Sequence, residues 1–205
     1  MKKLFTILCA GVLSLGVSAQ TQFGVTAGLN MANLSASEKY DEIDGLKMGV
    51  HVGISADVLL SDAMSLKTGA FFSMKGAEET IDVPFLGPVT GTYRLSYIEI
   101  PMDLSFAVSD QMSLIAGPYM GFLMGAELEF SGAGAIAANN AGKFDIEDNV
   151  ASMDFGINLG ASFAVTEVIS INAGYQIGLT ELDVDGNVDS KNTNIHIGMT
   201  FAFGS

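Results

Sequence analysis

Ionisable and amide side chains occupy alternate positions in several apolar segments of this sequence. If those segments are β-strands, alternate residues share one face, so the polar ones gather on the inside of a closed sheet. The set comprises Lys47, His51, Asp57, Lys67, Lys75, Glu99, Asp103, Asp154, Asn158, Asn172, Gln176, Asn194 and His196. Burying such groups within a membrane costs free energy unless they are paired or have a function. They therefore indicate an ion path, a polar ligand site or a hydrogen-bonded plug.

We favour the plug, because the interior of an eight-stranded barrel is just filled by side chains. A filled interior also argues against continuous conductance. Three lysines would then balance three carboxylates, namely Lys47, Lys67 and Lys75 against Asp57, Glu99 and Asp103.

His51 and His196 are the only histidines, and both are expected near the external end of inward rows. A lipid hydrolase would need a histidine beside a Ser or Thr nucleophile and an orienting acid. Ser55 follows His51 by four residues, about 13 Å along a strand, so it shares the face without contact. We therefore expect hydrogen-bonded structural histidines and no catalytic residue, with a hydrolase as the least favoured alternative.

Acidic segments suggest cation binding only loosely. Residues 183–189 have the carboxylate-rich, glycine-turned character of a calcium loop, but the twelve-residue spacing and terminal Glu are missing. An acidic solvated turn is the simpler reading. With Lys+Arg 9 against Asp+Glu 23, the chain lacks the basic surface of a nucleic-acid binder. We expect no cofactor, no dedicated metal site and no nucleic-acid partner.

Strict alternation of apolar and polar residues predicts the strands that position these groups. It is clearest at 169–179. After the first twenty residues, the longest stretch free of charged and strongly polar side chains is 114–126, which is too short for a membrane helix and contains Pro118. Eight strands are predicted, at about 23–31, 48–60, 64–75, 94–108, 112–125, 155–165, 169–179 and 195–203.

A repeated polar turn predicts how these strands pair. Similar sequences at 61–69, 109–117 and 166–174 each read as a tight hairpin. Closing the first hairpin with Leu60 against Met64 places Asp57 opposite Lys67 and Val58 opposite Leu66. The third hairpin places Asn158 opposite Gln176 and Phe163 opposite Ile171.

The other connections are long and hold most of the 23 acidic residues: 32–45, 76–93, 126–152 and 181–193. Short turns alternating with long loops are typical of an outer-membrane barrel, with turns in the periplasm and loops outside the cell. We therefore predict an all-β fold, an eight-stranded antiparallel up-and-down transmembrane β-barrel.

Glycine distinguishes a membrane barrel from a soluble one, whose apolar row would fill the interior. Every glycine in the predicted strands shares the register of the polar residues. Small residues are needed inside a narrow barrel. Glu99 would face Gly121, Asp103 would face Gly117 and Phe71 would face Gly53. The uninterrupted apolar row is therefore expected to contact lipid.

Two further expectations concern prolines and aromatic residues. Pro101 and Pro118 each remove a hydrogen bond from the ladder and are expected at bulges. Tyr93, Tyr97 and Phe130 are candidates for an external aromatic girdle.

The first residues resemble an export signal. Met1-Lys2-Lys3 is cationic, Leu4 to Val17 is mostly apolar, and Val17-Ser18-Ala19 has the small-x-small pattern of a cleavage site near Ala19/Gln20. We predict a signal peptide at 1–19 and a barrel domain at 20–205. Cys9, the only cysteine, lies in the signal, so disulfides and thiolate sites are not expected in the mature protein.

Three motifs together resemble the PorT-like outer-membrane β-barrel domains of the Bacteroidota. They are Phe23-Gly24-Val25-Thr26-Ala27-Gly28-Leu29-Asn30, Tyr97-Ile98-Glu99-Ile100-Pro101-Met102 and Ile197-Gly198-Met199-Thr200-Phe201-Ala202-Phe203. The resemblance spans nearly all of 20–205 and implies an eight-stranded barrel. It also implies an association with secretion.

These observations predict a non-enzymatic outer-membrane protein with a structural or interaction role in the cell envelope, associated with adhesion or secretion. A small porin or ligand conduit is the alternative. The expected partners are outer-membrane lipid, lipopolysaccharide bridged by loosely bound divalent cations, and other envelope proteins.

Overall fold

The computed structural model describes residues 21–36, 45–137, 139–184 and 190–203. The predicted signal peptide, including Cys9, and most of the acidic turn at 183–189 lie outside these residues. No helix in the described part of the chain is long and apolar enough to cross a membrane.

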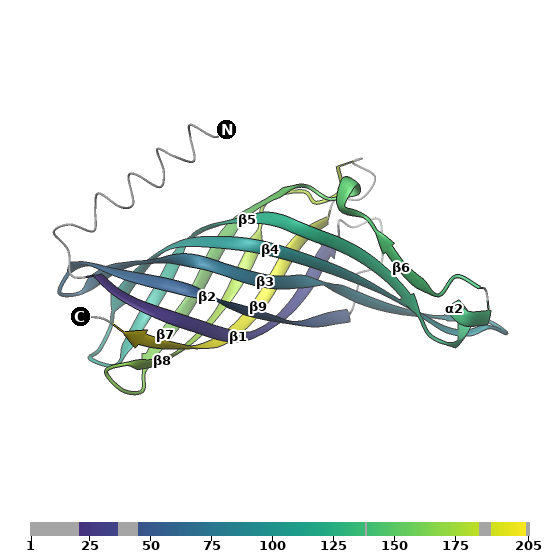
Figure 1. The fold of residues 1–205 in the computed structure, drawn as a ribbon. Helices are drawn as coiled ribbons and strands as arrows, with labels where there is room; N and C mark the ends of the chain where they lie inside the picture. The colour runs from purple at the N-terminus through teal and green to yellow at the C-terminus, as the bar shows by residue number, and fades with distance from the viewer. Residues whose placement is uncertain (1–20, 37–44, 138, 185–189, 204–205) are drawn as a thin grey trace.

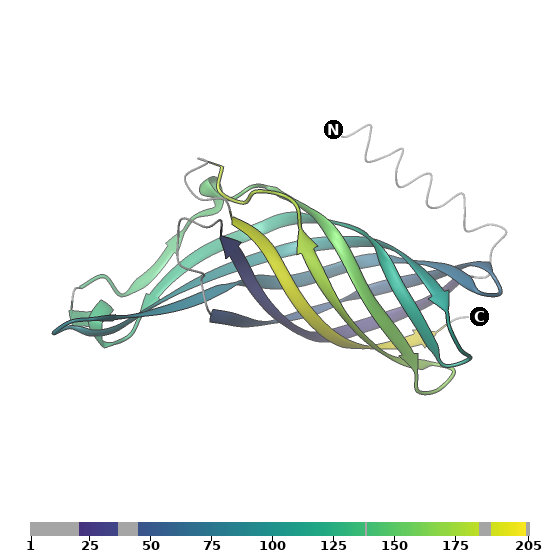
Figure 2. The same cartoon turned by 180° about the vertical axis from the view of Figure 1, so that it is seen from behind.

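The described chain is almost entirely antiparallel β-structure. The elements are β1 (Thr21–Ala36), β2 (Gly45–Ser61), β3 (Met64–Val83), β4 (Gly87–Ala107), β5 (Met112–Ser131), α2 (Ala133–Ala137), β6 (Gly142–Asp145), the 3-10 helix η1 (Glu147–Asn149), β7 (Met153–Ala164), β8 (Ile169–Gly178) and β9 (Ser190–Phe203). Eight of the strands pair in sequence order, and β1 also pairs with β9, which closes the barrel. Figures 1 and 2 show the barrel from opposite sides.

The predicted all-β up-and-down barrel is therefore confirmed, with one addition. Short strand β6 pairs with β5 beyond the point where β7 begins, and it makes a ninth strand outside the closed ring of eight. We call the end with the tight β2–β3, β4–β5 and β7–β8 connections the turn end, and the opposite end the loop end.

The predicted hairpin registers are confirmed at the charged and amide pairs. Asp57 lies opposite Lys67, and Asn158 lies opposite Gln176. The first turn differs by one residue, because Ser61 rather than Leu60 pairs with Met64 after a register shift at Leu59. The shift leaves Val58 opposite Leu66, as predicted.

The prediction of long loops at 76–93 and 126–152 was wrong in large part. Strands β3, β4 and β5 run for 20, 21 and 20 residues, and residues 84–86 alone separate β3 from β4. About 9–11 residues of a tilted strand cross a bilayer. These three strands, joined by β6 and α2, therefore project well past the other strands at the loop end, as Figure 1 shows.

The apolar row of each barrel strand faces outward. Met48 is 59% exposed, Ile54 64% and Phe201 55%, and the neighbouring apolar residues on the same rows are also exposed. Soluble monomers rarely expose large continuous apolar surfaces. The orientation expected for lipid contact is present around the whole ring.

Glycines line the inner face opposite bulky groups. Phe71 pairs with Gly53, where an added Cβ would lie 2.7 Å from the Phe71 Cα atom. At Gly117 an added Cβ would lie 2.6 Å from the Asp103 Cα atom, and Glu99 pairs with Gly121. Small residues thus make room for interior side chains, as expected for a narrow barrel.

The expected bulges at the prolines are not present. Pro101 pairs with Tyr119 and Pro118 with Ile157 in unshifted register. The irregularity between β4 and β5 lies instead at Ser96 and Tyr97. Each strand therefore accommodates the absence of a proline N–H donor without an extra residue in the strand.

An arginine on the outward row should lower the stability of the protein only where the strand belongs to the closed ring of eight. Ile197→Arg, near the middle of β9, should lower the free energy of unfolding from lipid vesicles by about 2–4 kcal/mol, because a charge would enter the apolar layer. Ile81→Arg is the matched control, since Ile81 is similarly exposed but lies on the projecting part of β3. Equal losses in the two variants would contradict the placement of the apolar layer.

Candidate functional site

A buried ion cluster crosses the barrel interior. The Lys75 ammonium on β3 lies 2.8 Å from a Glu99 carboxylate oxygen on β4 and 3.9 Å from Asp154 on β7. The side chains of Lys75 and Asp154 are each 1% exposed. In such surroundings a charge is tolerated only with close partners, so this cluster ties three strands together.

Two tyrosines complete the cluster. The Lys75 ammonium lies 4.3 Å from the centre of the Tyr119 ring, and the Tyr119 hydroxyl donates to Asp154 over 3.2 Å. Asn192 on β9 donates to the Asp154 carboxylate at 2.9 Å and to the Tyr97 hydroxyl at 3.3 Å. These contacts give hydrogen-bond partners to two buried groups, the Asp154 Oδ2 atom and the Tyr97 hydroxyl.

Tyr97 was therefore misassigned to an external girdle, since it is fully buried. Tyr97 shares the inward row with Glu99 two residues later. Tyr93 is also partly buried, against an apolar group at the loop end formed by Leu34, Ala77, Leu95, Ala126 and Leu182. This apolar group and the ion cluster together fill the loop-side part of the interior.

Amide side chains extend the network toward the turn end. Gln176 donates to Glu99, and Asn194 donates to the Gln176 carbonyl oxygen over 3.0 Å. Asn158 donates to the Asp103 carboxylate over 2.7 Å. Asn172 donates to the Thr200 hydroxyl over 2.8 Å, nearer the turn end.

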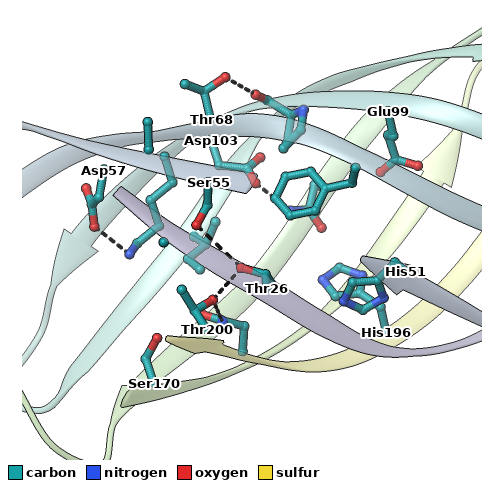
Figure 3. Close-up of a pocket in the computed structure, with 18 of the residues that line it drawn as sticks. Thr26, His51, Ser55, Asp57, Thr68, Glu99, Asp103, Ser170, His196 and Thr200 are labelled. Carbon is teal, nitrogen blue, oxygen red and sulfur yellow. Dashed lines mark hydrogen bonds and ion pairs between the residues drawn. The ribbon is translucent and has the colours of Figure 1, made fainter. Parts of the chain in front are cut away.

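The turn-side half of the interior contains a cavity of about 170 Å³. Its wall includes Asp57 and Lys67, which form an ion pair of 2.6 Å, and it reaches Glu99 at its inner end. Lys75, Tyr97, Tyr119 and Asp154 do not line it. The ion cluster therefore stands between this cavity and the loop end, and Figure 3 shows the polar residues around the cavity.

His51 and His196 line the same cavity, with ring centres 5.9 Å apart and ring planes at 86°. The His51 Nδ1 atom lies 2.9 Å from the side-chain amide oxygen of Asn30. Ser55 instead accepts a weak hydrogen bond from Thr26 at 3.4 Å. The arrangement therefore pairs His51 with an amide, and a serine–histidine–acid triad is not among the contacts of the described residues.

Most of the sequence-predicted interior residues come together in this network, but Lys47 does not join it. Lys47 is buried at the loop end of β2, and its ammonium donates to the Met48 carbonyl at 3.4 Å. The expected balance of three lysines by Asp57, Glu99 and Asp103 is thus wrong in detail. Asp154, rather than Asp103, lies beside a lysine, because it is 3.9 Å from the Lys75 ammonium. No cluster of three or more metal-ligating side chains is found among the described residues.

Sequence reasoning missed Tyr119, Asn192 and Asn30 as interior residues. Each shares an inward row with a residue already assigned there: Tyr119 lies between Gly117 and Gly121, and Asn192 precedes Asn194 by two residues. Asn30 follows Gly28 in the same way. The alternation of apolar and polar residues therefore indicated that these side chains point inward, although it did not indicate which side chains would meet across the barrel.

Removing the central cation should be strongly destabilising. Lys75→Met leaves Glu99 and Asp154 buried without a cation, so the free energy of unfolding should fall by about 3–5 kcal/mol in a denaturant titration. Lys143→Met is the control, because the Lys143–Glu127 pair is exposed and should contribute less than about 1 kcal/mol. The triple variant Lys75→Met/Glu99→Gln/Asp154→Asn should recover most of the loss. A Lys75→Met protein as stable as the parent would contradict the role of the cluster.

Comparisons with known proteins agree with this architecture. The crystal structure of Neisserial surface protein A superposes with a TM-score of 0.57 at 18% identity, over 90% of this chain and 99% of that one. The attachment invasion locus protein Ail of Yersinia pestis, crystallised with the heparin analogue sucrose octasulfate, gives a TM-score of 0.51 at 13% identity, over 90% and 99% of the two chains. No curated protein sequence matches. A family model described as outer membrane protein beta-barrel domain matches residues 18–184, so the chain belongs to that family of outer-membrane β-barrels.

Proposed function

We propose that this outer-membrane barrel is a non-enzymatic structural or interaction protein of the cell envelope. The observation that carries the proposal is the contrast between its two ends. The loop-side interior is filled by an apolar group and a buried ion cluster, whereas β3, β4 and β5 continue past the ring as a hydrogen-bonded sheet. A filled interior favours contacts made by the outside of the protein over transport through it.

The projecting sheet is supported by packing against a short helix. Helix α2 packs against β4, where Gly134 lies so close to Val89 that an added Cβ would be 2.8 Å from a Val89 methyl group. Phe85, at the tip of the β3–β4 hairpin, is completely exposed. Ile81, Leu86 and Ile136 of the same projecting part are also exposed. Exposed apolar side chains grouped on one surface are typical of a protein contact.

The charge of the projecting sheet limits the kind of partner. The Arg94 guanidinium pairs with Glu129 at 2.7 Å and the Lys143 ammonium with Glu127 at 3.4 Å, while Glu78 and Asp82 are exposed. A partner with basic groups fits such a surface better than a polyanion does. Divalent cations bridging lipopolysaccharide to these carboxylates are part of the same proposal.

The same features support our proposal for the orientation of the protein in the membrane. In this proposal residues 1–19 are a cleaved signal peptide, residues 20–205 form the barrel domain, the tight turns face the periplasm, and the projecting sheet and acidic loops are extracellular. Membership of the PorT-like branch rests on the three motifs alone and would connect the protein with secretion. The names of the similar barrels, a surface protein and an attachment protein, are consistent with a role at the surface.

A small conduit is the second candidate, because a cavity occupies the turn-side half of the interior. Planar-bilayer recording of the purified protein separates the two. We expect no stable conductance steps, since the ion cluster lies between the cavity and the loop end. Reproducible ion-selective steps that disappear on heat unfolding would favour the conduit and contradict the filled interior.

The projecting sheet can be tested in intact cells with a photo-crosslinking amino acid. Placed at Phe85, it should give a discrete protein adduct from the extracellular side. The control position is Val168, which is exposed at the turn end. Absence of a Phe85-specific adduct, with the variant correctly assembled, would count against an interaction role for this surface.

A further inference from the structure

We propose that His51 and His196 bind a divalent transition-metal ion, of the Zn²⁺ or Cu²⁺ class, at the inner end of the turn-side cavity. The two imidazoles come from β2 and β9, which flank β1, and their ring centres are 5.9 Å apart. Two imidazoles that share a tetrahedral ion have ring centres about 5 Å apart, given metal–nitrogen distances of about 2.0–2.1 Å. The pair is therefore about 1 Å from a ligating separation.

The hydrogen bonds of Asn30 determine the tautomer of His51. The Asn30 amide nitrogen donates to the Met74 carbonyl and the Ser73 hydroxyl, each at 3.0 Å. A backbone carbonyl can only accept a hydrogen bond, so the Asn30 side-chain atom that faces Met74 must be the nitrogen. The other atom of this side-chain amide, which lies 2.9 Å from His51 Nδ1, is therefore the oxygen. His51 Nδ1 therefore carries the proton, and Nε2 keeps a free lone pair. A carbonyl holding the other ring nitrogen is the usual support of a metal-binding histidine.

His196 also has an uncommitted nitrogen. Its Nδ1 atom is buried and has no hydrogen-bond partner. A buried polar atom without a partner carries a desolvation penalty, which a bound ion would remove. Each ring therefore has a nitrogen without a hydrogen bond, and both histidines line one cavity.

Glycines keep the wall clear for both rings. An added Cβ at Gly198 would lie 2.7 Å from His51 Nε2, and one at Gly174 would lie 2.7 Å from His196 Nε2. The His51 ring thus reaches across β1 to Gly198, which is two residues from His196 on the same strand. Figure 3 shows the two rings next to one another on the cavity wall. The close approach depends on the absence of side chains at these positions.

Charge in this part of the interior favours a dication. Four carboxylates lie around the cavity and the adjoining cluster, and two lysines face them: Asp57, Glu99, Asp103 and Asp154 against Lys67 and Lys75. Lys47, the remaining inward lysine, lies at the loop end and does not line the cavity. The carboxylates therefore outnumber the lysines by two in surroundings of low dielectric constant, and a divalent ion would offset this excess.

The donor type selects the class of metal. Imidazole nitrogen suits zinc, copper and nickel, whereas calcium and magnesium prefer sets of oxygen ligands. Water in the cavity would supply the remaining positions, and access would be from the turn end. Glu99, which lines the same cavity, is held by Lys75 and Gln176 and acts as a charge in the cavity wall rather than a ligand.

The small number of histidines makes the test direct, because the whole chain contains His 2 and Cys 1. The protein would be extracted from the outer membrane without a histidine tag and titrated with Cu²⁺ and, separately, with Zn²⁺ against a chelator. We expect a saturable site of one ion per chain, with a Cu²⁺ electron paramagnetic resonance spectrum split by two nitrogen nuclei. His51→Gln and His196→Gln should each weaken binding by at least about 10-fold, since even supporting residues cost about 10–100-fold.

Asn30→Ala tests the positioning of His51 and should weaken binding by about 10-fold while both nitrogens remain visible in the Cu²⁺ spectrum. Asn172→Ala, another amide on the cavity wall, is the matched control and should leave the affinity unchanged. Heat-modifiable gel mobility checks that each variant is folded. If a histidine variant does not fold, the parent Cu²⁺ spectrum decides. A spectrum with oxygen ligands alone, no saturable binding, or equal Zn²⁺ affinity without both histidines would overturn the proposal.

Discussion

The need to satisfy every backbone hydrogen bond without water determines the rest of this structure. In a lipid layer an open sheet edge is not tolerated, so the sheet must close on itself. The pairing of β1 with β9 closes the ring, and it runs without a register shift from Phe23–Phe203 to Ala36–Ser190. Closure divides each strand into two rows, one facing lipid and one facing a narrow interior.

One part of the barrel interior is filled by side chains and another contains a cavity, and the size of the inward-facing residues determines the difference. Toward the loop end, Tyr97 and Tyr119 occupy space beside Lys75 and leave almost no exposed surface. Toward the turn end, smaller residues such as Thr26, Ser55 and Thr200 line the cavity. The ion cluster therefore acts as a partition between a closed half and an accessible half, and the histidine pair lies on the accessible side.

Alternation in the sequence predicted the barrel well because the ring strands have an apolar and a polar face. Asp57 opposite Lys67 and Asn158 opposite Gln176 needed only the position of a tight turn. The projecting parts of β3–β5 were taken for loops because residues such as Glu78, Glu79 and Asp82 interrupt the apolar pattern. Outside a membrane neither face of a strand needs an uninterrupted apolar row, so the pattern that identifies strands is lost there.

Contacts across the barrel were harder to predict for a different reason. Row assignment tells which residues point inward, but their height depends on strand tilt and stagger. Lys75 and Asp154 meet from β3 and β7, which do not pair, so no hairpin register relates them. Tyr97 was misplaced because aromatic residues suit both a girdle and an interior, and only the row of Glu99 distinguishes these positions.

The most direct measurement of the two-faced barrel is spin-label accessibility along β9. Single cysteines, in a Cys9→Ser background, would be labelled in turn from residue 193 to residue 201 in lipid vesicles. We predict high collision with dissolved oxygen at Ile195, Ile197, Met199 and Phe201, and low oxygen collision at the positions between them. Absence of this two-residue period, or a period with the apolar positions protected from oxygen, would contradict the lipid-facing assignment on which the whole structure rests.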